Sequence, residues 1–166
     1  MGDPTPCSEW NVRALINHNL KVAGFVAGVY RENITVSPLD VGGPLPEGDA
    51  LELLDAGIGN VLEVLKSVGS LDQKISSPFG EMTRAEFLMN PTWDLLVHTW
   101  DLAKGTSQST TLDSHLVEVC HNAFAPMMDH MREEEFGGVK IMGPEVQVSA
   151  SASLQDRFLG IMGRQP

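Results

Sequence analysis

Four segments of this chain repeat apolar residues every three or four positions, and this period constrains the fold more than any other feature. The segments cover about 8–30, 49–68, 84–104 and 113–134. A period of 3.6 residues gives a helix one apolar face, which other helices have to cover. A shorter helix is expected over about 154–162. We therefore predict an all-α protein in which four helices form an antiparallel, up-and-down bundle, followed by a short C-terminal helix.

The ends of the segments carry ordinary helix signals. Ser8 and Asp49 are expected N-caps, because their side-chain oxygens can accept hydrogen bonds from the first backbone N–H groups. Pro91 either kinks the third helix or marks its true start, and Pro126 is expected to kink the fourth. On the fourth helix the residues expected to share the buried face are Leu116, Val119, Ala123, Met127 and Met131.

Two connections are informative. Residues 33–48 are rich in proline and glycine and are expected to form a long surface loop. Residues 74–82 (KISSPFGEM) contain two short β-capable pieces and are expected to form a hairpin or an ordered loop. The whole length, 166 residues, is that of one domain, which we assign to 1–166.

The composition excludes several functional classes. The chain has 22 acidic and 11 basic residues and a net charge of −11, so binding to nucleic acid or to an anionic membrane is not expected. There is no apolar run of the roughly 20 residues that span a bilayer, and the N-terminus does not resemble a signal peptide. With only two cysteines, Cys7 and Cys120, a reducing, cytoplasmic location is predicted.

A histidine lies inside the apolar arc of the first helix. At about 100° per residue, His18 falls between Leu15 and Val22 on the helix surface. A buried imidazole without a partner costs roughly 1–3 kcal/mol, so His18 is expected to have a polar partner inside the protein.

The third helix offers that partner. Asp94, His98 and Asp101 are spaced i, i+4 and i+7, and they therefore share one helix face that apolar residues flank. Buried carboxylates are expensive unless a cation compensates them. His18, Asp94 and His98 can together bind a divalent metal and leave a position open for water or substrate. Asp101 is predicted to serve catalysis by orienting His98 or a bound water.

Simpler interpretations remain open. His18 can be a satisfied packing residue, Asp94 and His98 can form an exposed i, i+4 contact, or the polar residues can form a buried hydrogen-bonded network. His130 can line the site or stabilise the end of its helix. Cys7 can be reactive, and a structural thiol beside Trp10 is the interpretation we prefer.

Three separated motifs and one short loop resemble a known family. They are residues 4–18 (PTPCSEWNVRALINH), 78–80 (PFG), 94–103 (DLLVHTWDLA) and 156–166 (DRFLGIMGRQP). They are similar to an actinobacterial DinB-like family that is related to the metal-binding domain of mycothiol-dependent maleylpyruvate isomerase. The resemblance covers nearly the whole chain.

The resemblance implies a helical bundle that holds one divalent metal, zinc or nickel. It carries the metal ligands over to His18, Asp94 and His98. In the isomerase the middle ligand is a glutamate, so Asp94 is a shorter substitute. The family includes transferases and isomerases that use mycothiol, bacillithiol or glutathione, and its name does not imply DNA binding.

Relatives usually carry a further helix before the PTPC motif, whereas this chain starts almost at the motif. If four helices do not complete the bundle, an apolar groove stays open and becomes an association surface. We therefore predict a homodimer.

The sequence thus predicts a divalent-metal-binding protein that acts as a thiol-dependent transferase or isomerase. Its partners would be a small-molecule thiol, with mycothiol as cosubstrate, and an electrophile. The alternatives are a metal-binding or sensor module without catalysis and a helical interaction protein without metal.

Overall fold

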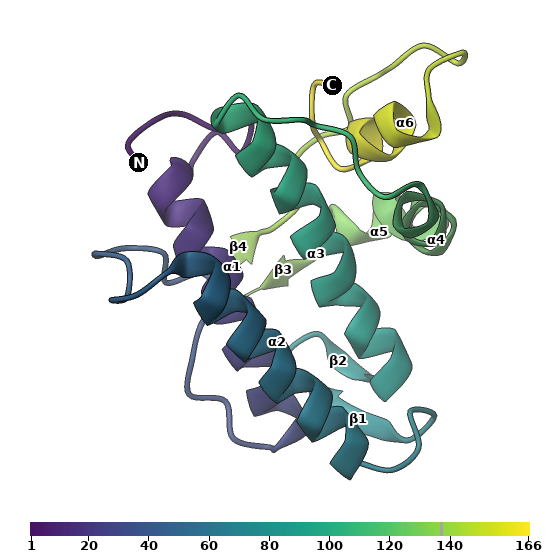
Figure 1. The fold of residues 1–166 in the computed structure, drawn as a ribbon. Coiled ribbons are helices and arrows are strands. Elements are labelled where there is room, and N and C mark those ends of the chain that lie inside the picture. Colours follow the sequence, from purple (N-terminus) through teal and green to yellow (C-terminus); the bar gives the residue numbers. More distant parts are fainter. Residues whose placement is uncertain (137) are drawn as a thin grey trace. The chain divides into compact units, whose positions relative to one another are not determined.

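The computed structural model describes residues 1–136 and 138–166 and shows a mostly helical chain (Figure 1). The chain divides into two compact units, Met1–Pro91 and Thr92–Pro166. The predicted helical character is confirmed, and the four-helix bundle stays a prediction. The described part also contains two small two-stranded antiparallel sheets, so the all-α class is wrong in this respect.

The first helix, α1 (Val12–Tyr30), starts later than the sequence predicted. Its N-cap is Asn11, whose side chain accepts a hydrogen bond from the backbone N–H of Ala14. The residues before it form a turn in which the Thr5 hydroxyl donates to the Trp10 carbonyl at 2.6 Å. Because this turn includes Ser8, the predicted cap at Ser8 is wrong.

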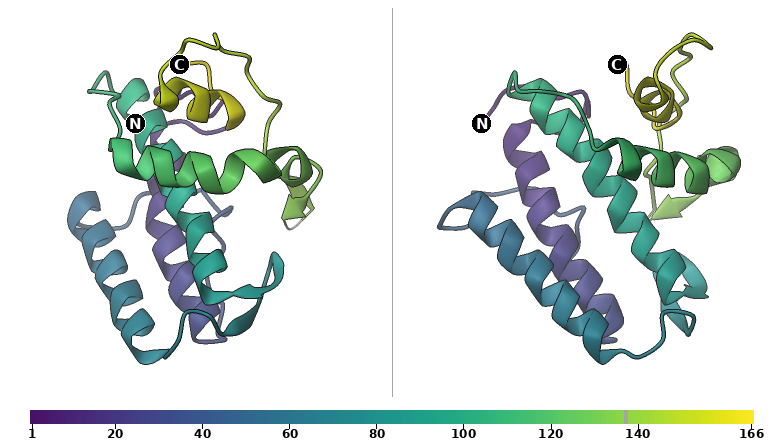
Figure 2. Two further views of the ribbon diagram at one scale, coloured as in Figure 1. Left: turned by 90° about the vertical axis from the view of Figure 1, so that its right-hand side faces the viewer. Right: turned by 45° about the vertical axis from the view of Figure 1, so that its right-hand side comes forward.

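The second helix, α2 (Ala50–Ser67), has the predicted N-cap, since the Asp49 carboxylate accepts from two backbone N–H groups. It packs beside α1 in all views (Figures 1 and 2). The two helices approach closely at Gly57, where an added Cβ would lie 2.9 Å from the Cβ of Ala23. No residue larger than glycine fits there unless the helices move apart.

Residues 74–82 were expected to form a hairpin or an ordered loop, and the structure shows a hairpin. Strands β1 (Lys74–Ser77) and β2 (Gly80–Thr83) pair in antiparallel register, with Lys74 opposite Thr83. The Ser77 side chain accepts from the backbone N–H of Phe79 within the turn. The hairpin leads directly into α3 (Arg84–Gly105), which continues through Pro91 rather than starting there.

Pro126 breaks the predicted fourth helix into three pieces. They are α4 (Ser114–Phe124), the 3₁₀ turn η1 (Ala125–Met127) and α5 (Met128–Met131). Proline has no backbone N–H and its ring obstructs the preceding turn, so the α-helical hydrogen bonds cannot continue. Beyond α5 lie the short strands β3 (Glu135–Phe136) and β4 (Val139–Lys140).

The second unit contains the expected C-terminal helix, α6 (Leu154–Ile161), which packs against α4. The core includes fully buried side chains from α3, α4, α5 and α6. They are Trp100, Cys120, Met128, Phe158 and Leu159.

The buried face of α4 differs from the predicted one. Val117, Cys120 and Phe124 are buried, whereas Leu116 and Val119 are exposed. In the part of the chain that the structure describes, no helix is long and apolar enough to cross a membrane.

Candidate functional site

His18 is buried in α1 and has a defined polar partner. Its side chain is 4% exposed, and its Nδ1 lies 2.8 Å from the carbonyl oxygen of Pro38. The Trp10 ring contacts the imidazole, with ring centroids 4.6 Å apart. A carbonyl oxygen only accepts hydrogen bonds, so the proton lies on Nδ1 and Nε2 is the basic nitrogen.

The loop over 33–48 is fixed to α1 by polar contacts. The Asn17 side chain donates to the Val41 carbonyl at 3.2 Å, and the Lys21 ammonium pairs with the Asp40 carboxylate at 3.0 Å. These contacts hold the loop in a position where the carbonyl oxygen of Pro38 forms a hydrogen bond with Nδ1 of His18. The loop was predicted from the sequence, but its hydrogen bond to His18 was not.

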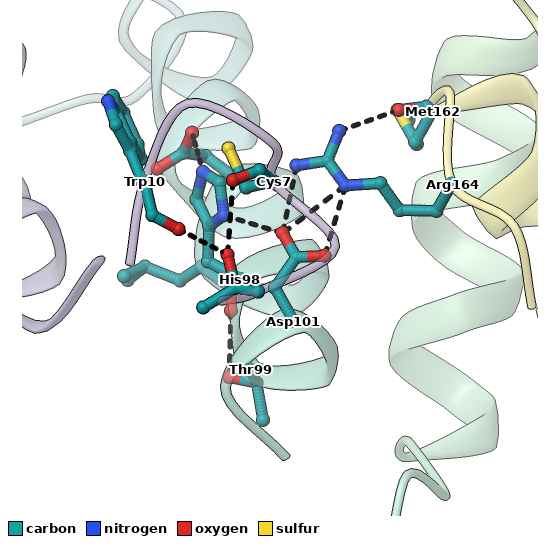
Figure 3. A network of polar contacts seen from close by, with 10 residues as sticks. Cys7, Trp10, His98, Thr99, Asp101, Met162 and Arg164 are labelled. Carbon is teal, nitrogen blue, oxygen red and sulfur yellow. Dashed lines mark hydrogen bonds and ion pairs between the residues drawn. The ribbon is translucent and has the colours of Figure 1, made fainter. Parts of the chain in front are cut away.

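On α3 the predicted stripe is present. His98 is 6% exposed, and its Nδ1 lies 2.9 Å from Oδ2 of Asp101 (Figure 3). Its Nε2 lies 3.6 Å from Oδ1 of Asp94. As for His18, a hydrogen bond at Nδ1 leaves Nε2 as the basic nitrogen, here facing a carboxylate oxygen.

The distance between Nε2 of His98 and Oδ1 of Asp94 bears on whether the pair could bind a metal. At 3.6 Å it is too long for a hydrogen bond. Two ligand atoms on one tetrahedral zinc ion, each about 2.0–2.2 Å from it, lie about 3.4 Å apart. The pair is therefore spaced like two ligands of one metal, and its donor types are ones that zinc accepts.

Asp101 is completely buried and receives hydrogen bonds from two sides. His98 contacts Oδ2, and the guanidinium of Arg164 donates to both oxygens at 2.8–3.2 Å. Burial by itself raises the pKa of this carboxyl, but the hydrogen bonds and charges of His98 and Arg164 outweigh it. The pKa of Asp101 therefore lies below its ordinary value.

The lowered pKa of Asp101 predicts how stability depends on pH. The ionised carboxylate stabilises the folded state above the unfolded-state pKa of about 3.9, and this contribution is lost as the pH falls through the lower folded-state value. In chelator-treated protein we expect Asp101→Asn to lower the free energy of unfolding at neutral pH by about 2 kcal/mol.

Urea titrations between neutral pH and about pH 3 measure this effect. The difference between wild type and Asp101→Asn should shrink as the pH falls below about 4. A difference that is independent of pH would contradict the role given to the carboxylate charge.

The other histidines lie apart from these contacts. His130 on α5 has a side chain that is 77% exposed and pairs with Glu134. His115 is exposed, and His121 is half-buried.

Both cysteines are free thiols but lie in different surroundings. Cys7 is half-buried in the turn before α1, whereas Cys120 is 0% exposed and burial raises the pKa of its thiol. We expect a thiol reagent to label Cys7 quickly in the native protein and Cys120 only after unfolding, since the thiolate is the reactive form.

Titration with a chromogenic disulfide checks this expectation. One thiol per chain should react fast in buffer and two in denaturant, and Cys7→Ser should remove the fast phase. Two fast thiols in the native protein would contradict the buried position of Cys120.

The fold and these side chains define a mostly helical protein with a buried histidine–carboxylate site. The family model for the mycothiol maleylpyruvate isomerase N-terminal domain matches residues 1–103. The chain therefore belongs to this family, and the predicted resemblance is confirmed.

Similar proteins include two uncharacterised proteins of Mycobacterium tuberculosis, from strains CDC 1551/Oshkosh and ATCC 25618/H37Rv. Each is 36% identical over 117 residues, which is 70% of this chain. The match spans 60% of the length of these relatives. No solved structure gives a significant match.

Proposed function

We propose that this protein binds one divalent metal, zinc or nickel, and acts as a metal-dependent thiol transferase or isomerase. The ligands would be His18, Asp94 and His98, with Asp101 fixing the orientation of His98. The observation that carries the proposal is the distance of 3.6 Å between His98 Nε2 and Asp94 Oδ1, which suits two ligands of one metal.

Among the described residues, two groups of side chains could hold a metal ion. One is His18, Asp94 and His98, and the other is Cys7, His98 and Asp101. We favour the first group, because Asp101 already accepts hydrogen bonds from Arg164 on both oxygens and from His98 on one. A metal ion at Asp101 would compete with these hydrogen bonds for the carboxylate oxygens.

The first group also has the protonation state that a metal needs. The hydrogen bonds to Pro38 and Asp101 keep the protons of both imidazoles on Nδ1, so each Nε2 is a lone-pair donor. Two histidines and one carboxylate leave a coordination position for a further ligand, as in catalytic rather than structural zinc sites.

The family and this donor set support a small-molecule thiol as the substrate class. A divalent metal, when bound, supplies Lewis acidity that favours the thiolate form of a coordinated thiol. A mycothiol-type thiol is the expected cosubstrate and a small electrophile its reaction partner, in the cytoplasm. The excess of acidic residues, 22 against 11 basic, disfavours nucleic acid and anionic membranes as partners.

Metal analysis and a thiol-transfer assay test the proposal. Protein purified without added metal should contain about one zinc or nickel ion per chain. Turnover of mycothiol with an electrophile should stop on chelation and return when metal is restored.

Each other outcome has a defined meaning. Bound metal without turnover of any electrophile would favour a non-catalytic metal-binding or sensor module. Protein that neither contains nor binds metal would overturn the proposal and favour a hydrogen-bonded network in a helical interaction protein.

We also propose that the protein is a homodimer that associates through α2. One strip of this helix is apolar and accessible, with Leu51, Ile58 and Leu62 being 65%, 39% and 53% exposed. Together with the half-buried Leu54 and Leu65, these residues cover an arc of about 80°. An apolar strip of this kind is typical of a helix–helix interface.

The charges beside the strip favour a second copy of this chain as the partner. Glu52 and Lys66 lie on the same side of the strip, about 80° and 40° beyond its edge. They are near opposite ends of α2, and within the chain Lys66 pairs with Glu63 at 2.7 Å. When two copies pack antiparallel around a two-fold axis, each Lys66 faces the partner's Glu52.

Light scattering tests the dimer. Wild type should have the mass of two chains, and Leu62→Glu should have the mass of one, whereas Leu116→Glu on α4 should stay dimeric. Lys66→Glu should weaken the dimer, and adding Glu52→Lys should restore it. A monomeric wild type, or a dimer that Leu62→Glu leaves intact, would overturn this interface.

A further inference from the structure

We propose that Arg164 is a positioning residue for His98, acting through Asp101. The proposal rests on the proposed function, because it assigns His98 Nε2 to a metal. It concerns a residue 63 positions away from Asp101 in the sequence, near the C-terminus of the chain.

Arg164 contacts both carboxylate oxygens of Asp101, and this contact is buried. Nε donates to Oδ1 and Oδ2 at 3.1 and 3.2 Å, and Nη2 donates to Oδ2 at 2.8 Å (Figure 3). The Asp101 side chain is 0% exposed and that of Arg164 is 15% exposed. A planar guanidinium bound to both oxygens fixes the plane of the carboxylate, which a single ammonium cannot do.

The backbone at the C-terminal end of α6 fixes the direction of the Arg164 side chain. The N–H of Gly163 donates to the Gly160 carbonyl, and the N–H of Arg164 donates to the Leu159 carbonyl, as in a Schellman motif. The motif requires the positive φ of +76° that Gly163 adopts. The guanidinium Nη1 also donates to the Met162 carbonyl at 2.9 Å. The guanidinium is therefore held by the end of α6 through Nη1 and by Asp101 through Nε and Nη2.

These contacts leave one orientation for the Asp101 carboxylate, in which Oδ2 accepts from His98 Nδ1 at 2.9 Å. In a neutral histidine the hydrogen-bond partner of one nitrogen decides which nitrogen carries the proton. By holding the acceptor at Nδ1, Arg164 keeps Nε2 as the lone-pair donor. Without Arg164 the carboxylate can turn, and the tautomer with the proton on Nε2, which cannot bind a metal through Nε2, gains population.

Nitrogen NMR of the full-length, chelator-treated protein tests this inference without any metal. Spectra are recorded in alkaline buffer, at about pH 9, because tautomers are a property of the neutral imidazole. In the wild type, the His98 tautomer should be the one with the proton on Nδ1. Arg164→Gln should shift the tautomer population of His98 toward Nε2–H. Arg157→Gln, which removes an exposed arginine from the same helix, should leave it unchanged.

Two further variants separate positioning from stability. Arg164→Lys keeps the charge but not the planar fork, so it should fold and still shift the tautomer. Gly163→Ala keeps the arginine but strains the backbone that aims it, and it should shift the tautomer in the same direction. Gly143→Ala, at a glycine with open space around it, is the matched control.

Metal titration gives the second readout. Arg164→Gln and Arg164→Lys should each weaken zinc affinity by about 10–100-fold, which is the usual effect of losing a residue that supports a ligand. A folded Arg164→Lys protein with the wild-type His98 tautomer would overturn the inference. Absence of zinc binding by wild type would instead overturn the proposed function, while the tautomer measurement would still decide the role of Arg164.

Discussion

Replacing His98 by alanine is expected to reduce the bound metal from about one ion per chain to none. His98 belongs to both groups of side chains that could hold a metal ion, so its loss disables either arrangement. Loss of a residue that only supports a ligand already weakens metal affinity by about 10–100-fold. Loss of a ligand itself should therefore weaken it by more than about 100-fold, and thiol transfer should disappear with the metal.

Elemental analysis and competition with a chromogenic chelator measure this effect. His130→Ala is the matched control, because it removes an exposed imidazole from α5. Circular dichroism should show that both variants are folded. Stoichiometric metal in His98→Ala, with unchanged affinity, would show that the metal lies elsewhere.

Two more variants decide between the candidate ligand groups. His18→Ala should abolish tight binding, whereas Cys7→Ala should retain the metal, if His18, Asp94 and His98 are the ligands. The opposite pattern would assign the metal to Cys7, His98 and Asp101. In either case His98 remains the shared ligand.

The helices were predictable because their signals are local. Asp49 caps α2 as predicted, and the hairpin lies where two short β-capable pieces flank a turn. The start of α1 was not predicted, because Ser8 and Asn11 are both good caps. A turn held by the Thr5 hydroxyl decides between them.

The buried face of α4 shows the limit of periodicity. Leu116 and Val119 form an apolar stripe, but Val117, Cys120 and Phe124 form another. A helix with two apolar stripes does not reveal which one is buried, since that depends on the neighbouring helix. Here α6 packs against α4, and Cys120 is buried as a small apolar residue.

The candidate site was predictable where it depends on helix geometry. Asp94, His98 and Asp101 share a face of α3 because of their spacing, and the hydrogen bond between His98 and Asp101 follows from it. The partners supplied by distant segments were not predicted, namely the Pro38 carbonyl and Arg164. Nothing local in the sequence says where a loop or a chain end will pack.

One signal could have pointed to Arg164. A glycine directly after a short amphipathic segment is typical of a helix C-terminus, and Gly163 occupies that position. The residue that follows such a glycine has a defined direction relative to the helix. A buried carboxylate such as Asp101 needs a cation, so an arginine at this position is a candidate partner.

The largest stability effect is expected for Phe87→Ala. Phe87 is 0% exposed and lies at the start of α3, where it contacts three aromatic rings of the first unit. The ring centroids of Phe25, Tyr30 and Phe79 lie 6.3, 5.6 and 6.4 Å from its own. Truncation to alanine removes these contacts and leaves a cavity, which should lower the free energy of unfolding by about 3–5 kcal/mol.

The matched control is Phe79→Ala in the hairpin turn. Phe79 contacts the same ring of Phe87 but is 39% exposed, so it leaves no closed cavity and should cost less than about 1.5 kcal/mol. Urea unfolding of both variants measures the difference, provided that the slope with denaturant stays constant. If both truncations had the same small effect, Phe87 would not be the centre of the aromatic cluster, and α1, the hairpin and the start of α3 would be held together by other contacts.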